Sequence, residues 1–333
     1  MVRTLLTRAG QLLLVLLGVS AVVFVAMHLL PGDVATLLLG DRATAVQLER
    51  LRSQLGLDQP VLVQYWRFLA DGLRGDFGTS ITNGRPALTE VMAAFPVTLQ
   101  LTLASLLLAA GAGIPLGVMA GMRQGSRLDA AVLGTTLVGV SVPIFWLGLM
   151  LLVLFAAGLD WLPTGGVMPI GQEPPRVTGM SIPDSILAGS PALLRLAVLH
   201  LVLPAVTLAT IPLALITRVT RAEVVAAGLQ DHVRTARAKG LQARLVVRRH
   251  ILRNAALPIL TVVGLQLGLL LSGAVLTESI YALPGLGRLM VDSILARDYP
   301  MVQAAAMFVA GVFVLVNFLV DVGYLLLDPR VRG

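Results

Sequence analysis

The sequence predicts an all-α integral membrane protein with six transmembrane helices. Apolar residues make up 56% of the 333 positions and charged residues only 13%, about half the charged share of a usual soluble domain. The chain also contains six long stretches without Asp, Glu, Lys or Arg. A bilayer core about 30 Å thick needs roughly 20 apolar residues in a helix, and each stretch is long enough. These stretches are residues 9–32, 91–122, 130–159, 196–217, 254–277 and 299–320.

The six stretches are expected to be helices because lipid cannot satisfy open backbone groups. Strands of a barrel would alternate between apolar and polar residues, whereas these runs are continuous. The first stretch follows Arg3 and Arg8 and could therefore be a secretory signal. However, its apolar part is longer than a signal core, and the residues that follow it, Leu30-Pro31-Gly32-Asp33, do not form a cleavage site. A retained first span is predicted.

The distribution of charge predicts the orientation. If the N-terminus is inside, the internal segments hold fifteen Lys and Arg against four Asp and Glu, and the external segments hold ten against thirteen. Excess Lys and Arg marks the cytoplasmic side. Both termini are therefore predicted to be cytoplasmic in a multi-pass protein. The internal segments are 1–8, 123–129, 218–253 and 328–333.

The external segment 33–90 is expected to contain two helices. Thr44 and Gln47 form a capping box that opens the first, and Gly56 closes it. Asp58 and Pro60 begin the second, whose aromatic stripe is expected to pack against protein or lipid rather than hold a ligand. The stripe is Tyr65, Trp66, Phe68 and Leu69. A second external segment, 160–195, is rich in Pro and Gly and is predicted to be mostly loop.

Several residues within the spans are expected to serve packing. Gly113, Gly117 and Gly121 lie four residues apart, a spacing that lets helix backbones approach closely, and contacts within the chain are favoured over dimerisation. The acidic residues Glu278 and Asp321 lie near span ends and are expected to pair locally rather than bind substrate. A packing or interfacial role is likewise expected for His28 and His200.

The internal segment 218–253 is strongly basic, with nine Lys and Arg against Glu223 and Asp231. Asp231 is a predicted N-cap for a short helix that Gly240 ends in a left-handed conformation. A second helix is predicted from 243 to 253. Small alanines on the short helix would let a partner protein approach closely. Lys239 and the arginines could pair with acidic groups of that partner or with anionic lipid.

The composition excludes several kinds of site. The chain has no cysteine, its four histidines show no metal-ligand spacing, and it contains a single lysine. A phosphate-binding loop of the G-x-x-x-x-G-K-[ST] type is also absent from the sequence. No catalytic, metal or ATPase site is therefore predicted in this chain. If it takes part in work driven by ATP, a partner must supply the ATPase.

The segment from Asp231 to Leu241 resembles the cytoplasmic coupling loop of permease subunits of bacterial ABC importers. The resemblance is to the dipeptide/oligopeptide/nickel permease family, in the subunit type with a long first external loop, and it covers nearly the whole chain. In place of the Glu of the general Glu-Ala-Ala signature stands Arg234-Thr235-Ala236, and the distance from Gly240 to Pro258 is longer than in the simplest motif. Both departures resemble the peptide subfamily. Further matching segments are Leu30-Pro31-Gly32-Asp33, Leu55-Gly56-Leu57-Asp58-Gln59-Pro60, Gly75-Asp76-Phe77-Gly78, Arg249-His250-Ile251-Leu252-Arg253-Asn254, Leu283-Pro284-Gly285-Leu286-Gly287, Arg297-Asp298-Tyr299-Pro300 and Leu327-Asp328-Pro329-Arg330.

The resemblance implies a type I ABC importer permease fold in the bacterial inner membrane. It implies residues 1–32 as the N-terminal end and first span, 33–90 as the helical insertion, 91–327 as the permease core with a coupling loop at 218–257, and 328–333 as a tail. The implied partners are a second permease, two ATPases that bind ATP and Mg²⁺, an external substrate-binding protein and membrane lipid, without nucleic acid. The implied ATPase-coupling residues are Asp231, Arg234, Thr235, Ala236, Arg237, Ala238, Lys239 and Gly240.

The implied substrates are dipeptides, oligopeptides, glutathione, nickel or metal chelates, with specificity set largely by the binding protein. The alternatives are a secondary transporter driven by an ion gradient and a membrane assembly subunit without transport. A secondary transporter is expected to carry acidic or broken-helix sites at mid-bilayer across two related halves. No span centre here carries a charge, and the sequence shows no internal repeat.

Overall fold

The computed structural model describes residues 2–29, 44–56 and 58–327. The predicted tail 328–333 and the segment 30–33 lie outside the described residues, as do the side chains of His28 and Asp321. The chain divides into two compact units. Residues 1–95 and 288–314 form the first unit, and residues 96–287 and 315–333 form the second.

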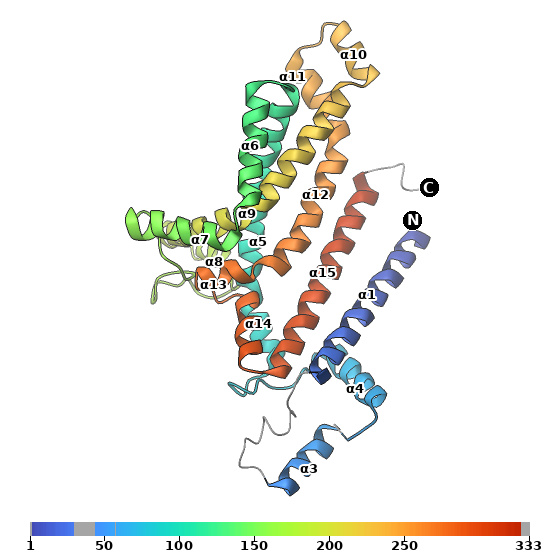
Figure 1. Cartoon of the computed structure of the whole chain (residues 1–333), viewed down its shortest axis with the longest axis vertical. Helices are drawn as coiled ribbons and strands as arrows, with labels where there is room; N and C mark the ends of the chain where they lie inside the picture. The colour runs from blue at the N-terminus through green and yellow to red at the C-terminus, as the bar shows by residue number, and fades with distance from the viewer. Residues whose placement is uncertain (1, 30–43, 57, 328–333) are drawn as a thin grey trace. The chain divides into compact units, whose positions relative to one another are not determined.

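The described part of the chain is helical apart from turns, loops and one isolated antiparallel bridge between Thr79 and Pro86 (Figure 1). Its long helices are α1 (Val2–Leu29), α5 (Ala87–Met122), α9 (Pro191–Gly228), α12 (Leu252–Gly273) and α15 (Tyr299–Leu327). Its shorter helices are α3 (Ala45–Leu55), α4 (Val61–Leu73), α6 (Arg127–Ser141), α7 (Ile144–Leu151), α8 (Ser181–Leu187), α10 (Asp231–Ala238), α11 (Ala243–Val246), α13 (Val275–Ile280) and α14 (Leu286–Leu295). Two π-helical segments, η1 (Leu152–Gly158) and η2 (Val247–Ile251), follow α7 and α11.

The two helices predicted in the external segment are confirmed. The Thr44 backbone N–H donates to Gln47 Oε1 at 2.9 Å, which completes the capping box of α3, and Gly56 ends that helix with φ +69°. The aromatic stripe of α4 packs within the first unit. The Tyr65 ring lies 5.3 Å from that of Phe24 on α1, and the Phe68 ring lies 5.9 Å from the same ring. Trp66 on the same helix is 67% exposed.

Four of the described helices are long and apolar enough to cross a membrane, and a bent pair could form a fifth span. The four are Ala87–Met122, Pro191–Gly228, Ala243–Leu271 and Tyr299–Val320. The first predicted span lies in α1, and Gly10–Ala26 is its apolar part within the described residues. The helical prediction for the apolar stretches is thereby confirmed.

The third stretch is not the continuous span that its composition predicts. It consists of α6 and of a second helix formed by α7 and η1. The second helix, Ile144–Gly158, is bent by 98° relative to α6. The bend lies at Val142 and Pro143, where Val142 has an extended backbone with ψ 126°. Proline disfavours a helical conformation in the residue before it and lacks an N–H of its own. These two effects end α6 and redirect the chain (Figure 1).

The glycine ridge of α5 packs against α9 within the second unit, and the predicted packing within the chain is confirmed. A Cβ placed on Gly117 would lie 2.6 Å from the Thr217 carbonyl oxygen, and one on Gly121 would lie 3.0 Å from the Arg221 carbonyl oxygen. Gly113 meets the backbone of Leu213 in the same way at 3.1 Å. Only a hydrogen at these positions lets the two backbones approach so closely.

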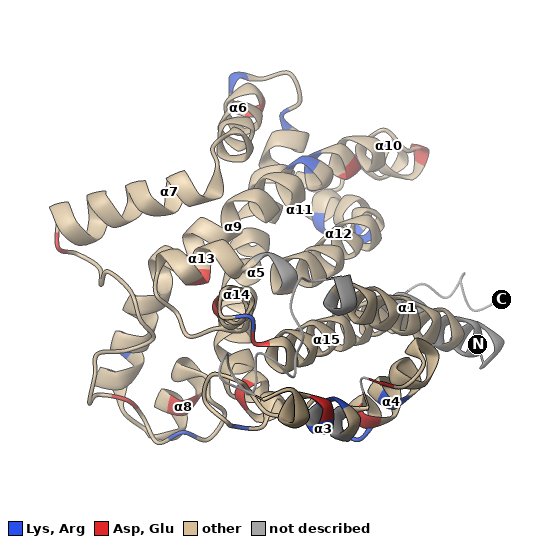
Figure 2. Ribbon diagram, turned by 60° about the horizontal axis from the view of Figure 1, so that its bottom comes forward, with Lys and Arg blue, Asp and Glu red and all other residues tan. Residues whose placement is uncertain are grey.

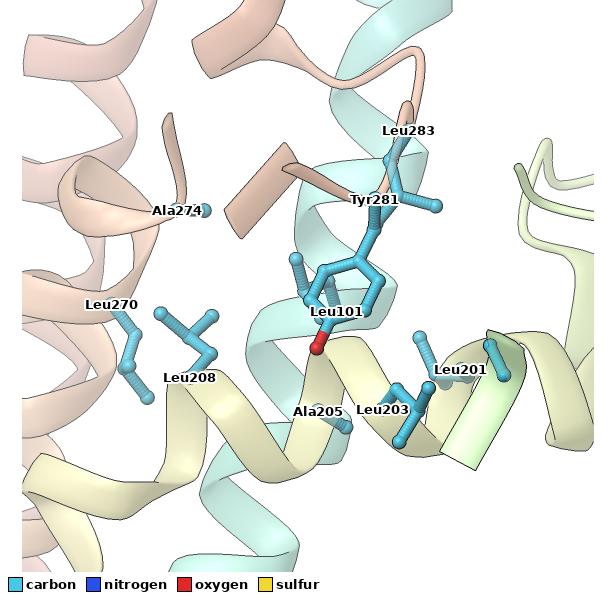
Figure 3. Close-up of a cluster of buried hydrophobic side chains, with 10 residues drawn as sticks. Leu101, Leu201, Leu203, Ala205, Leu208, Leu270, Ala274, Tyr281 and Leu283 are labelled. Carbon is cyan, nitrogen blue, oxygen red and sulfur yellow. The ribbon is translucent and has the colours of Figure 1, made fainter. Parts of the chain in front are cut away.

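The core of the second unit surrounds Tyr281, whose ring points between helices among leucine side chains (Figure 3). The residue is fully buried. Its hydroxyl lies 2.8 Å from Thr207 Oγ1 on α9 and donates to the Gly148 carbonyl oxygen on α7 at 3.2 Å. Its own carbonyl accepts from Gly166 at 2.9 Å. Tyr281 therefore ties two helices and a loop to one point.

The segment 160–195 is loop only over its first part, because it also contains α8 and the beginning of α9. Asp184 on α8 organises this loop by accepting hydrogen bonds from the backbone of Val177, Thr178 and Gly179 and from the Thr178 hydroxyl. Burial raises the pKa of the Asp184 carboxyl, but these hydrogen bonds outweigh burial and hold its pKa below its ordinary value.

Glu278 is fully buried within the second unit and is paired, as predicted for a structural role. Its Oε1 accepts from the Thr98 hydroxyl at 2.6 Å, and the same hydroxyl oxygen accepts from the Leu286 N–H at 2.8 Å. Gly285 lies against the carboxylate so closely that a Cβ there would be 2.3 Å from Glu278 Cδ. The Leu-Pro-Gly-Leu-Gly segment thus folds around a buried carboxylate.

Candidate functional site

The basic segment forms a helix, a glycine turn and a second helix at one end of the second unit (Figure 1). Here α10 contacts the end of α9, α11 and the π-helical segment η2. The second helix runs from α11 through η2 directly into α12, so the predicted segment 243–253 continues into a membrane-spanning helix. Lys and Arg gather around these elements (Figure 2). The short helix is therefore attached to two spans.

Two side chains anchor α10 to this support. Val233 and Ala236 lie three residues apart, so they share one face of the helix, and they are 0% and 4% exposed. They pack in one cluster with Val224 and Ala227 of α9 and with Ile251 of η2. Burying such apolar side chains contributes on the order of 1–2 kcal/mol each. The opposite face of α10 is left accessible.

A polar contact also fastens α10 to η2 and to the start of α12. The Asn254 side-chain nitrogen donates to the His250 carbonyl oxygen at 2.8 Å and lies 2.8 Å from His232 Nε2. The rings of His232 and His250 are 6.2 Å apart. The segment Arg249 to Asn254 was one of the segments that match the permease family in sequence. Its contact with His232 on α10 was not predictable, because the contact depends on the π-helical turn. Such turns insert one residue and are frequent at functional sites.

The residues predicted to contact an ATPase divide between the two faces of α10. Asp231, Arg234, Thr235, Arg237, Ala238, Lys239 and Gly240 are exposed. Ala236 is the exception, because its side chain packs inward. It therefore serves the anchor, and the exposed part of the predicted site consists of the other seven residues.

The predicted N-cap is wrong by one residue. Gln230 is the N-cap and makes no side-chain cap hydrogen bond, whereas Asp231 is the first helical residue. The Asp231 carboxylate is 98% exposed and lies 3.8 Å from Arg234 Nη1. A carboxylate in the first turn still favours the helix through the dipole, which explains why the sequence pattern resembled a cap.

The predicted left-handed end at Gly240 is confirmed. Gly240 has φ +74°. Its N–H donates to the Arg237 carbonyl oxygen at 2.9 Å, and the Leu241 N–H donates to the Ala236 carbonyl oxygen at 3.3 Å. This pair of bonds is the Schellman arrangement, which favours glycine. A Cβ on Gly240 would meet nothing within 4 Å. Backbone conformation, and not space, therefore requires the glycine.

A buried ion pair joins the first turn of α6 to the same end of α9. Arg221 donates to both carboxylate oxygens of Asp129, at 2.6 and 2.7 Å, and Asp129 is 3% exposed. The carboxylate also accepts from the Gly125 N–H at 3.0 Å. The hydrogen bonds from Arg221 lower the pKa of Asp129 from 3.8 to about 2. This end of α9 is therefore held on two sides, by α10 and by the first turn of α6.

Comparison with known proteins identifies the family. Residues 113–333 match the family model described as the inner membrane component of binding-protein-dependent transport systems, and residues 1–102 match the N-terminal model of such membrane components. The chain is 45% identical to the probable D,D-dipeptide transport system permease protein of Escherichia coli, over 98% of this chain and 96% of that protein. It is 42% identical to the di/tripeptide transport system permease protein of Pseudomonas aeruginosa, over 98% and 97%. It is 38% identical to the glutathione transport system permease protein of Salmonella paratyphi A, over 100% and 99%.

A solved structure supports the fold. A chain of the MetNI methionine ABC transporter, determined in inward-facing conformations, matches with a TM-score of 0.54 and 16% identity over 72% of this chain and 96% of that one. This likeness shows the type I ABC importer permease fold. The family matches do not support the alternative that the chain is a secondary transporter. The chain belongs to the family of binding-protein-dependent transport system inner membrane components and is a permease subunit of an ABC importer.

Proposed function

We propose that this permease carries peptides or similar small solutes, and that α10 receives the movement of a cytoplasmic ATPase. Peptide and glutathione permeases among its relatives support the substrate class. Dipeptides, oligopeptides, glutathione and chelated nickel all belong to that class. The partners in this proposal are a second permease, two ATPases that bind ATP and Mg²⁺, and an external substrate-binding protein.

The observation that carries the coupling role is the attachment of α10. Its inward face packs on α9 and on η2, which leads into α12. Its outward face presents Arg234, Arg237 and Lys239 to solvent. A protein that pushes on the outward face therefore displaces the ends of two spans together. The proposal places this end, and both chain termini, in the cytoplasm of a bacterium, in agreement with the excess of Lys and Arg.

The contact with the ATPase can be tested by charge reversal on the outward face. In the reconstituted transporter, Arg237→Glu should reduce co-purification of the ATPase and the uptake of a labelled dipeptide. Arg127→Glu is the matched control, because Arg127 is also an exposed arginine of an internal segment but lies on α6. Equal ATPase recovery and uptake in the two variants would refute contact through α10.

The transmission of movement can be tested at Gly240. Gly240→Val forces a β-branched residue into a left-handed conformation, at a cost of roughly 1–2 kcal/mol, and should loosen the end of α10. The expected result is ATP hydrolysis that continues while dipeptide uptake falls. Gly240→Asn is the control, because asparagine tolerates this conformation, and it should transport normally. Normal uptake by the Val variant would contradict the proposal.

A further inference from the structure

A groove at the ends of two spans combines an apolar floor with three arginines. Its volume is ≈ 470 Å³, and it is lined by the end of α5 on one side and by α11, η2 and the start of α12 on the other. This volume lies within the range of about 300–1,000 Å³ typical of small-molecule sites. The lining residues are Val118, Met119, Met122, Arg123, Arg244, Val247, Arg248 and Leu252.

The floor of the groove is built into the fold. Val118, Val247 and Leu252 pack against the same buried cluster that anchors α10. Met119 and Met122 project from α5 and are 46% and 38% exposed. Methionine side chains are flexible and adapt to apolar ligands of irregular shape. The floor therefore offers a stable apolar surface with an adaptable rim.

The charge at the groove has one sign. Arg123, Arg244 and Arg248 are exposed, and no Asp or Glu occurs among the residues that line the described groove. The carboxylate of Asp129, six residues after Arg123, is bound by Arg221. Guanidinium groups bind phosphate through paired hydrogen bonds. The groove is therefore complementary to a ligand with a phosphate group.

The position of the groove selects the source of that phosphate. Met122 and Arg244 mark the same end of two membrane-spanning helices, Ala87–Met122 and Ala243–Leu271. Lipid head groups lie at the ends of spans, and basic pockets between such helices bind anionic lipids. We propose that this groove binds an anionic phospholipid, with its phosphate on the three arginines and its acyl chains along Met119 and Met122.

The proposal does not depend on the coupling role of α10 and can be tested separately. The full chain, purified in detergent, is incubated with phosphatidylglycerol or with phosphatidylcholine, and bound lipid is counted by native mass spectrometry. The variant Arg123→Gln/Arg244→Gln/Arg248→Gln should lose affinity for phosphatidylglycerol by roughly fivefold for each arginine and roughly a hundredfold in all. Binding of phosphatidylcholine should change little.

The matched control is Arg127→Gln/Arg249→Gln/Arg253→Gln, which removes the same charge from exposed positions that do not line the groove. It should retain phosphatidylglycerol, and thermal melting should show all three proteins folded. An equal loss in the control would attribute binding to bulk charge and overturn the proposal. Displacement of the lipid by inorganic phosphate alone would overturn the role of the apolar floor. Unchanged binding of phosphatidylglycerol by the groove variant would overturn the proposal itself.

Discussion

The ion pair between Asp129 and Arg221 gives the most quantitative prediction. Arg221 lowers the pKa of Asp129 from 3.8 to about 2, a difference that corresponds to about 2 kcal/mol at neutral pH. The Arg221 side chain keeps 23% of its surface exposed, so solvent screening reduces this contribution. The substitution Asp129→Asn keeps the shape of the side chain and removes its charge. We expect it to lower the free energy of unfolding by about 2 kcal/mol.

The contribution of Asp129 to the free energy of unfolding should depend on pH. The pKa of Asp129 is lower in the folded state, so its contribution is present above pH 3.8 and is lost as the pH falls toward 2. The difference between wild type and Asp129→Asn should therefore be largest at pH 7 and fall to about half at pH 3. Only a contribution that depends on the carboxylate charge shows this convergence.

The measurement is thermal unfolding of the purified chain in detergent at both pH values. A loss of about 2 kcal/mol should lower Tm by about 3 °C at pH 7, because the entropy of unfolding is about 2.1 cal/mol/K for each of the 333 residues. Asp71→Asn is the control, because Asp71 and Arg74 form an exposed pair 3.8 Å apart, and such pairs contribute about 0–1 kcal/mol. An unchanged Tm for Asp129→Asn, or a difference from wild type that stays the same at pH 3, would refute the reasoning.

Three further substitutions test other parts of the second unit through Tm. Gly117→Leu should destabilise the protein by about 1–3 kcal/mol because its Cβ would meet the α9 backbone, whereas Gly111→Leu has nothing within 4 Å and should melt like wild type. Gly285→Ala should cost a similar amount by displacing the Glu278 carboxylate, and a wild-type Tm would show that this segment moves aside freely. Asp184→Ala leaves three backbone N–H groups without their acceptor and should lower stability by about 1–3 kcal/mol. A wild-type Tm for Asp184→Ala would argue against that role.

Local rules predicted local structure well. The capping box at Thr44 and the left-handed ends at Gly56 and Gly240 depend on residues within a few positions of one another, so the sequence contains all the information they need. The glycine ridge of α5 was also readable, because small residues four apart lie on one helix face. That the ridge packs against α9 was not predictable, because the glycines do not specify which helix they contact.

The features that the sequence did not predict depend on packing between segments that are distant in the chain. The stretch 130–159 was predicted as one span, because apolar composition alone does not distinguish a continuous span from two helices that meet at 98°. The inward position of Ala236 depends on the direction in which α10 packs, which Val233 settles only when α9 and η2 are in place. The π-helical turn at η2 shifts the register by one residue and brings His250 and Asn254 to His232. No periodicity in the sequence marks such an insertion.

The features that matter for the proposed mechanism converge on α9. This helix has 38 residues, a length of roughly 57 Å, and all of them belong to the second unit. Thr207 joins it to the core at Tyr281, and Arg221 joins it near its end to the first turn of α6. Val224 and Ala227 receive the anchor of α10 one turn further on. In the proposed mechanism we expect a push on α10 to reach Tyr281 along this helix, because close packing transmits displacement with little compression. On that basis, loosening Gly240 should uncouple transport without unfolding the protein.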